Sequence, residues 1–387
     1  MDDQQWSSAL RLAGFYGTMF GAIGIHLPFW PVWLESARGM TPGEVGLLLA
    51  AMYWPRVVAS LVLARLADRS GSRKRLVVAL AATGFVTTAL FAMADGFWPL
   101  LALSLLSGAA MSGLLPLGEA TALEEARATG FDYARVRLVG SLTFVLAAAG
   151  AGLAVERHGA DLILPLLLLS LGVVLIACLT MPDGRRPAAR GGGLAIAQVA
   201  RLDGLWPVLT AAALIQVSHA VYYGFATLHW RAAGLGGGTI GWLWAEAVVA
   251  EVILFGIAGP LVARSRPASL LVAVAVLGAA RWLGTAATTD LAALMVIQAL
   301  HAATFGLTHL ATMRHLQDVA PAHALATAQG LFASLLALLF GLMTPLAGWL
   351  YGGLGRLAFL VMAGLPVVAM LLLFASGRAR RASSAMP

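Results

Sequence analysis

The stretch Glu119–Arg137 has the sequence EATALEEARATGFDYARVR, and it joins two long apolar segments through a short charged turn. Its end residues, Glu119 and Arg137, already lie in the apolar flanks, each nine residues from Ala128 at the centre of the turn. In a helical hairpin they would lie at about the same depth, where a carboxylate and a guanidinium are expected to pair. Ionisable residues at such depth in a membrane are rare and usually functional. The stretch therefore predicts a membrane hairpin that carries a functional charge pair.

The composition of the chain is that of a polytopic membrane protein. Of its 387 residues 60% are hydrophobic and 11% are charged, whereas soluble domains carry about 25% charged residues. The net charge of +7 comes from short loops between apolar segments, so we expect a lipid bilayer as partner and no nucleic acid. The single cysteine, Cys178, lies in an apolar run. We therefore expect no disulfide framework, no metal site and no cofactor.

Twelve apolar segments are long enough to span a membrane, which takes about 20 residues each. The basic, glycine-rich segment 182–204 separates six of them from the other six. This predicts an all-α fold with two six-helix bundles, residues 1–181 and 205–387, joined by a linker. The first segment is full length, so we expect it to be retained as a helix rather than removed as a signal peptide. The predicted spans are 8–34, 43–66, 74–93, 97–122, 135–155, 160–181, 205–229, 238–263, 268–287, 290–314, 323–351 and 355–376.

Arginine and lysine are concentrated in the loops after every second predicted span and in the C-terminal tail. Cytoplasmic loops of membrane proteins carry this excess of positive charge. The pattern places both termini and the segment 182–204 in the cytoplasm. We expect a multi-pass protein of the bacterial inner membrane.

Ionisable residues also occur inside the predicted spans, where each costs about 2.5–3.5 kcal/mol at a helix centre on insertion scales. Acids and bases are balanced, which favours a shared aqueous cavity over a lipid-facing surface. A guanidinium suits the geometry of a carboxylate, and aromatic side chains suit an aromatic ligand, although helix packing explains such rings equally well. The candidates for a substrate site are Glu119, Arg137, Trp30, His219, Tyr222, Tyr223, Trp244 and Arg281.

Two acids in the span 238–263 are candidates for carrying a proton. Glu246 and Glu251 are five residues apart and point about 140° from each other, so both can hardly face one cavity. Glu251 is the deeper of the two and is the first choice, with Glu246 second. His301 is a third candidate, although a membrane histidine is also a common interhelical hydrogen-bond partner.

The segment 64–75 follows the second span, and the segment 259–266 aligns with it 195 residues later, which predicts a parallel repeat. The first copy, ARLADRSGSRKR, resembles the loop signature of the major facilitator superfamily, although Ala64 replaces its opening glycine and the second copy lacks the aspartate. The resemblance implies a gating role for Asp68, Arg69 and Arg73. A basic turn set by topology alone is the alternative.

The segment 133–141, YARVRLVGS, resembles the start of helix 5 in lactose-permease-like proton symporters. The resemblance implies that Arg137 pairs with Glu119, and it matches Arg281 and His301 to that family's arginine and histidine. Thr304 stands where the family has its proton-handling glutamate. A coupled proton would therefore need another acid, which again favours Glu251 or Glu246.

A resemblance over nearly the whole chain is to the phenylpropionate permease group. It rests on HLPFWPVWL at 26–34, DYARVRL at 132–138, HAVYYGF at 219–225, VVAEVILF at 248–255 and the segment 300–314. In that group the acid at Glu119 is an aspartate, and Glu251 is shared. The resemblance implies a proton symporter of a small organic solute, and an aromatic carboxylate such as 3-phenylpropionate is the favoured candidate. We expect the protein to import this solute and to act as a monomer.

Other functions are compatible with the same sequence. A sugar or nucleoside symporter would use Glu119 to accept hydroxyl hydrogen bonds, and an efflux antiporter would use the same cavity in the other direction. A membrane scaffold or receptor without transport belongs to a different class and would not need the cavity charges. An enzyme is not expected, because the loops are too short for a catalytic domain and carry no nucleophile–base pair or phosphate-binding loop.

Overall fold

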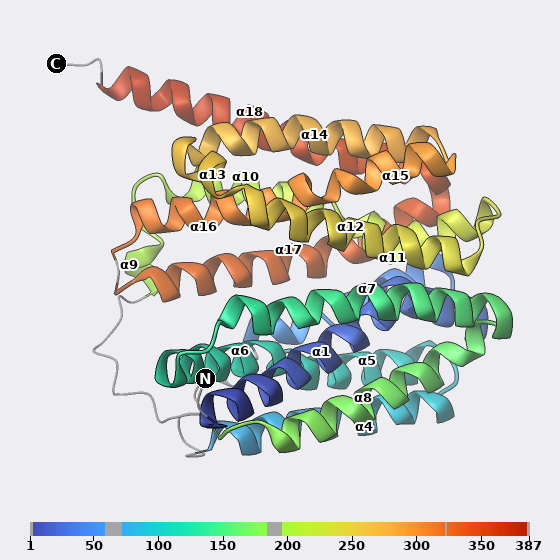
Figure 1. Cartoon of the computed structure of the whole chain (residues 1–387). Helices are drawn as coiled ribbons and strands as arrows, with labels where there is room; N and C mark the ends of the chain where they lie inside the picture. Colours follow the sequence, from blue (N-terminus) through green and yellow to red (C-terminus); the bar gives the residue numbers. More distant parts are fainter. Residues whose placement is uncertain (1–2, 59–71, 184–195, 322, 385–387) are drawn as a thin grey trace. The chain divides into compact units, whose positions relative to one another are not determined.

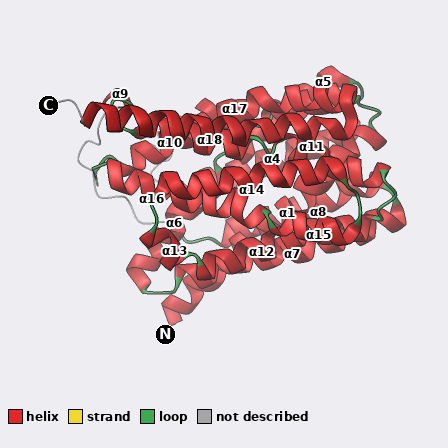
Figure 2. Cartoon of the chain, turned by 90° about the horizontal axis from the view of Figure 1, so that it is seen from above, coloured by secondary structure: helices red, strands yellow, loops and turns green. Residues whose placement is uncertain are grey.

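The computed structural model describes residues 3–58, 72–183, 196–321 and 323–384, and every regular element in those ranges is a helix (Figures 1 and 2). Ten helical segments in these ranges are long and apolar enough to cross a membrane. Nine of them correspond to single predicted spans, and the tenth, Leu325–Arg378, contains the last two. The remaining predicted span, 43–66, lies partly outside the described residues.

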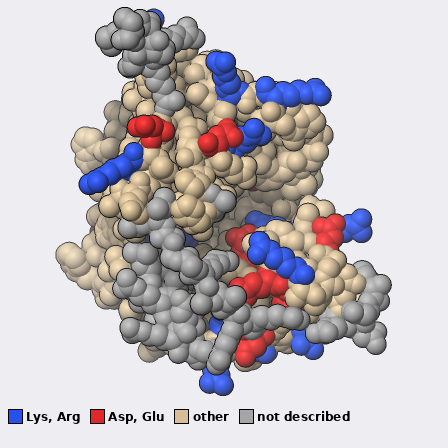
Figure 3. Space-filling model, turned by 90° about the vertical axis from the view of Figure 1, so that its left-hand side faces the viewer, with Lys and Arg blue, Asp and Glu red and all other residues tan. Residues whose placement is uncertain are grey.

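The chain divides into two compact units. The first unit comprises Met1–Ala188, Gly224–Ala245 and Thr344–Trp349, and the second comprises Ala189–Tyr223, Glu246–Met343 and Leu350–Pro387. This division follows contacts rather than sequence halves, and the two predicted bundles with their linker stay a prediction. Figure 3 shows charged side chains of both signs on the left-hand face of Figure 1, where α1 begins.

In the first unit, α1 packs against α6, α7 and α8, and α4 packs against α5 and α8. Its core contains the fully buried Leu12, Phe15 and Tyr16 of α1. Gly118 and Gly140 lie directly against the rings of Phe15 and Phe20, so the absence of a side chain on these glycines allows the close approach of helices. Its helices are α1 (Asp3–Val32), η1 (Trp33–Ala37), α2 (Pro42–Ala50), α4 (Arg73–Leu90), η2 (Phe91–Met93), α5 (Phe97–Met111), α6 (Leu114–Thr129), α7 (Tyr133–His158), η3 (Ala160–Leu162) and α8 (Ile163–Thr180).

The predicted hairpin at Glu119–Arg137 is confirmed, because α6 ends at Thr129 and α7 begins at Tyr133. Gly130 terminates α6 in the left-handed conformation with φ +78°, which glycine adopts without a steric penalty. The side chain of Asp132 accepts hydrogen bonds from the backbone N–H groups of Ala134 and Arg135 and so caps α7. Two local sequence signals therefore fix the turn.

Two further crossings within the first unit are made between glycines. Gly46 of α2 contacts Gly348, and Gly152 of α7 contacts Gly237 and Gly241. A side chain at these positions would meet backbone atoms rather than a movable neighbour. Small residues at these sites therefore allow the backbones to touch.

In the second unit, α14 packs against α16 and α18, and α10 packs against the same two helices. A π-helical turn, η4 (Ala302–Leu307), interrupts the path between α15 and α16 and packs against α14. Such turns are rare and occur often at functional sites. The remaining helices, of which α11, α12 and α17 contribute residues to both units, are α9 (Ile196–Val199), α10 (Leu205–Val217), α11 (Ala220–Ala232), α12 (Gly237–Ile257), α13 (Gly259–Arg264), α14 (Pro267–Ala287), α15 (Leu291–Ala299), α16 (Thr308–Val319), α17 (Leu325–Leu354), η5 (Gly355–Leu357) and α18 (Ala358–Ser384).

Candidate functional site

Arg281 of α14 is completely buried in the second unit, with none of its surface exposed. Its Nη1 lies 3.0 Å from Thr304 Oγ1 and its Nη2 lies 3.3 Å from Gln298 Oε1, and it donates a hydrogen bond to each. The same Nη1 lies 2.9 Å from His219 Nε2 and 3.2 Å from His301 Nδ1. We call Arg281 and these four partners the arginine cluster.

The partners of Arg281 come from separate elements. His219 lies in the turn between α10 and α11, Gln298 is on α15, and His301 and Thr304 lie at the start of and within η4. The widened turn of η4 brings His301, which precedes it, and Thr304, which lies in it, into contact with Arg281. The cluster therefore depends on how three segments pack around α14.

Hydrogen bonding assigns the protonation of His219. Its Nδ1 lies 3.0 Å from the carbonyl oxygen of Gln216, so this nitrogen carries the proton and donates. Its Nε2 is then an acceptor for the guanidinium. A second proton on either histidine would place two cations in contact, so both histidines are neutral partners of Arg281.

The charge of Arg281 is not balanced by an acid, because within the described ranges it forms no ion pair. Its Nε atom is also buried without a hydrogen-bond partner among the described residues. Removing an ion from water costs several kcal/mol, and neutral hydrogen bonds repay only part of this cost. Among the described residues, the charge of Arg281 is therefore met by neutral partners alone.

Aromatic rings surround the cluster. The guanidinium lies 4.7 Å from the ring centroid of Tyr222 and 4.4 Å from that of Trp282. Tyr223 stacks on His219 at 5.6 Å and is only half-buried, whereas Tyr222 is fully buried. The Tyr222 hydroxyl accepts a hydrogen bond from Gln298 at 2.8 Å. Three predicted residues, His219, Tyr222 and Tyr223, are thus brought together with Arg281.

The two acids of α12 occupy different surroundings within the second unit. Glu246 lies within electrostatic reach of Tyr222, and its Oε2 is buried without a hydrogen-bond partner among the described residues. Glu251 packs beside η4. A Cβ atom added to Gly306 of η4 would lie 3.3 Å from the Cγ of Glu251. Glu251 is therefore near η4, which carries Thr304 of the arginine cluster, and Glu246 is near Tyr222, whose ring lies beside the cluster.

The expected ion pair between Glu119 and Arg137 is wrong for this structure. The Tyr133 hydroxyl donates a hydrogen bond of 2.7 Å to Glu119, while the guanidinium of Arg137 lies 4.0 Å from the ring centroid of Phe20. Within the described ranges Arg137 has no salt bridge or hydrogen bond. Equal depth did not produce contact, because a tyrosine and the rings of α1 satisfy the two groups separately. Arg137 is half-buried, and its guanidinium lies over the rings of Tyr16 and Phe20.

Trp30 and Trp244 belong to the first unit and are nearly inaccessible, at 2% and 3% exposure. Trp30 stacks between His26 and Trp33, with centroid distances of 5.6 Å and 4.6 Å. Trp244 donates its indole hydrogen to Thr227. Both rings are occupied by packing within the protein.

The three predicted gating residues are only partly described. Asp68 and Arg69 lie outside the described residues. Arg73 at the start of α4 forms a two-pronged ion pair with Glu124 of α6, with N–O distances of 2.8 and 3.1 Å. The pair links two helices of the first unit.

Sequence reasoning missed several residues of the site. Thr304 was noted only for lacking the carboxylate of relatives, and it now contacts both Arg281 and His219. Gln298 precedes His301 by three residues, a helical spacing that could have drawn attention to it. Tyr133, the partner of Glu119, lies within the quoted hairpin but gave no signal of its own.

Comparison with known proteins identifies the family. The family model described as MFS_1 like matches residues 9–359. The chain belongs to this family of major facilitator transporters. It is 37% identical over 318 residues to the probable 3-phenylpropionic acid transporter of Escherichia coli (strain K12), covering 79% of this chain and 81% of that one. It is 24% identical over 340 residues to the maltose permease of Geobacillus stearothermophilus, covering 86% and 85%.

Solved structures share the fold of this major facilitator protein at low sequence identity. The nucleoside transporter NupG matches with a TM-score of 0.83 and 14% identity, covering 97% of this chain and 99% of that one. A bacterial homolog of the human lysosomal transporter Spinster matches with a TM-score of 0.76 and 13% identity, covering 98% of each chain. The predicted all-α fold is thereby confirmed. The protein is a multi-pass secondary transporter of a small molecule and not an enzyme.

Proposed function

We propose that this transporter is a proton-coupled symporter that imports an aromatic carboxylate, such as 3-phenylpropionate, across the bacterial inner membrane. The observation that carries the proposal is the buried charge of Arg281, which neutral groups surround within the described ranges. A carboxylate is the ligand that would balance it. The E. coli relative is described as a probable transporter of such an acid, which supports the same substrate class.

The carboxylate would bind the guanidinium as a two-pronged, charge-assisted pair. One edge of the guanidinium fork is formed by Nε and one Nη atom. The Nε atom has no partner among the described residues. Thr304 and the two histidines hold the other hydrogen bonds and keep the fork in place. The ligand therefore need not displace every existing partner of Arg281.

The aromatic body of the substrate would pack against Tyr223 and Tyr222. The two rings are 5.4 Å apart and lie beside the cluster, and Tyr223 is the more accessible of the two. An offset or edge-to-face ring contact is worth about 0.5–1.5 kcal/mol beyond the area that it buries. A phenyl ring joined to a carboxylate by two carbons would be recognised at both ends. Arg137 is proposed as a second anion contact in the first unit.

We propose that the coupled proton is carried on α12, by Glu251 or by Glu246. A carboxyl group out of water takes up a proton more readily, and the Oε2 of Glu246 is buried without a partner among the described residues. His301 is better suited to position Arg281, because a proton on this histidine would be repelled by the guanidinium 3.2 Å away. Entry of one anion with one proton would move no net charge.

The predicted bundles, 1–181 and 205–387, would rock about the substrate site, as in other transporters built from repeats. In this proposal Asp68, Arg69 and Arg73 form part of the cytoplasmic gate, the protein acts as a monomer, and both termini are cytoplasmic. The ion pair of Arg73 with Glu124 supports a bracing role at that end of α4.

A ligand panel on the purified protein tests the substrate class. 3-Phenylpropionate should raise the thermal unfolding temperature, whereas 3-phenylpropanamide, the neutral isostere, should have little effect. Maltose and uridine test the sugar and nucleoside alternatives in the same assay. If the amide stabilises the protein as much as the acid does, recognition of the carboxylate by Arg281 is contradicted. If a sugar or a nucleoside alone stabilises it, that compound replaces the proposed substrate.

A further inference from the structure

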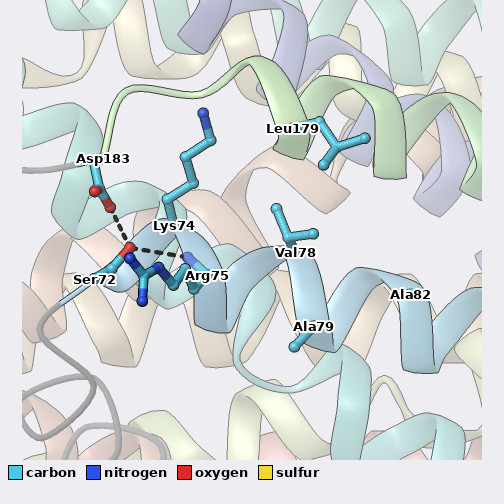
Figure 4. A pocket seen from close by; sticks show the side chains of 8 residues that line it. All are labelled: Ser72, Lys74, Arg75, Val78, Ala79, Ala82, Leu179 and Asp183. Atoms are coloured by element: carbon cyan, nitrogen blue, oxygen red, sulfur yellow. Dashed lines mark hydrogen bonds between the residues drawn. The ribbon is translucent and has the colours of Figure 1, made fainter.

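A cavity of about 480 Å³ lies between the start of α4 and the end of α8, within the first unit (Figure 4). Figure 4 shows its polar side chains at one end and its apolar side chains along α4 and α8. The lining is formed by Ser72, Lys74, Arg75, Val78, Ala79, Ala82, Leu179 and Asp183.

The polar end carries two cations, Lys74 and Arg75, that have no acidic partner among the described residues. Lys74 is half-buried and Arg75 is exposed, and within the described ranges neither forms an ion pair. Asp183 is the one acid among the described residues of the lining, and its carboxylate accepts a hydrogen bond from Ser72. The lining therefore has a net charge of about +1, and the positive end of the α4 dipole adds to it.

The apolar floor follows the cations along the helix. Val78 and Ala82 are four and eight residues after Lys74, so they share its face of α4. Leu179 of α8 lies on the other side of the cavity. The cavity thus has a cationic end and an apolar strip of about one helical turn on α4.

The cavity is located where two membrane spans end. The span of α4 begins at Arg73, and that of α8 ends at Thr180. The cations consequently lie at the membrane surface, and the apolar floor extends into the hydrocarbon. Basic pockets between helices at this level suit anionic lipid headgroups.

We propose that this cavity binds an anionic phospholipid, with the phosphate at Lys74 and Arg75 and one acyl chain along Val78, Ala82 and Leu179. A soluble phosphate compound would leave the apolar floor uncovered, and a zwitterionic lipid would leave the cationic charge unbalanced. The bound lipid would hold the ends of α4 and α8 together, beside the ion pair of Arg73 with Glu124. The site is independent of the transported substrate.

Native mass spectrometry of the purified full-length protein tests the proposal. Phosphatidylglycerol is titrated against phosphatidylcholine with the same acyl chains, and glycerol phosphate is added as a competitor without acyl chains. The wild type should bind phosphatidylglycerol several-fold more tightly than phosphatidylcholine, and glycerol phosphate should not displace it. Equal binding of the two lipids, or displacement by glycerol phosphate at equal concentration, would overturn the proposal.

Charge variants locate the headgroup. One basic residue near an anionic lipid is worth about a factor of five, so Lys74→Gln with Arg75→Gln should weaken phosphatidylglycerol binding about 25-fold. The matched control, Arg264→Gln with Arg266→Gln, removes two exposed arginines from the corresponding loop of the repeat and should leave binding unchanged. If both double variants lose the same affinity for phosphatidylglycerol, the loss follows from net charge alone and the proposed site is overturned.

Apolar variants test the acyl strip without altering charge. Ala82→Phe fills the floor of the cavity and should weaken both lipids at least fivefold. Val276→Phe adds the same ring at an exposed position of α14, outside the lining, and should have no effect. Unchanged lipid binding in Ala82→Phe would contradict the placement of the acyl chain, even if the charge variants fail to fold.

Discussion

Replacing Arg281 with glutamine is the most informative perturbation of the proposed substrate site. The change removes a buried charge but keeps a side chain that can hydrogen-bond to Thr304 and Gln298. Removing one member of a buried, hydrogen-bonded charge pair costs about 2–5 kcal/mol of binding. At 1.4 kcal/mol per factor of ten, Arg281→Gln should weaken 3-phenylpropionate binding by about 30-fold to several thousand-fold.

The ligand-free protein should respond differently to the same substitution. The charge of Arg281 has no acidic partner among the described residues, and replacing buried ions by neutral groups is often neutral or stabilising. We therefore expect Arg281→Gln to unfold within a few degrees of the wild type when no ligand is present. This separates a residue kept for binding from one kept for folding.

Isothermal titration calorimetry measures the first effect, and thermal unfolding without ligand measures the second. Arg314→Gln is the matched control, since it removes an exposed arginine paired with Asp318 on α16 and should change neither quantity. Wild-type affinity in Arg281→Gln would refute the anion site. A variant that no longer folds would instead show that the charge serves the structure.

Three other experiments test separate parts of the account. One of the two variants Glu251→Gln and Glu246→Gln should lose uptake driven by a proton gradient but preserve substrate exchange, and gradient-driven uptake in both variants would exclude α12 as the proton carrier. Gly140→Ala places a carbon 2.9 Å from the Phe20 ring and should lower the free energy of unfolding by about 1–3 kcal/mol, measured by denaturant titration, whereas an unchanged value would contradict the close contact. A double-mutant cycle on Arg73 and Glu124 should give a coupling of about 1 kcal/mol or less, because both side chains keep some solvent contact, and a coupling of several kcal/mol would contradict that estimate.

The all-α membrane fold could be predicted from the sequence, because the length of each apolar segment and the charge of each loop are visible along the chain without knowledge of contacts between distant segments. The hairpin of α6 and α7 was also predictable, since Gly130 and Asp132 act through their own backbone neighbourhood. One local signal was overlooked: α2 ends at Ala50 inside the predicted span 43–66. Pro55 has no N–H and its ring would clash with the carbonyl of Ala51, which explains the break.

The site was less predictable because it depends on contacts between distant segments. Arg281 and His219 are 62 residues apart in sequence, and only helix packing brings them to 2.9 Å. The π-helical turn that contains Thr304 has more residues per turn than an α-helix. A prediction that assumes a regular α-helix therefore assigns Thr304 to the wrong face of the helix. The prediction of an ion pair between Glu119 and Arg137 was wrong for a related reason. The spacing in the sequence predicts the depth of each group, but it does not show which neighbouring side chains contact them.

Transport of 3-phenylpropionate tests the central claim most directly. Purified protein is reconstituted into proteoliposomes, and uptake of the labelled acid is followed with and without an inwardly directed proton gradient. We expect accumulation above the external concentration that collapses when a protonophore is added and is absent in Arg281→Gln. Failure to accumulate the acid in correctly reconstituted vesicles, or accumulation that is indifferent to the proton gradient, would contradict the account.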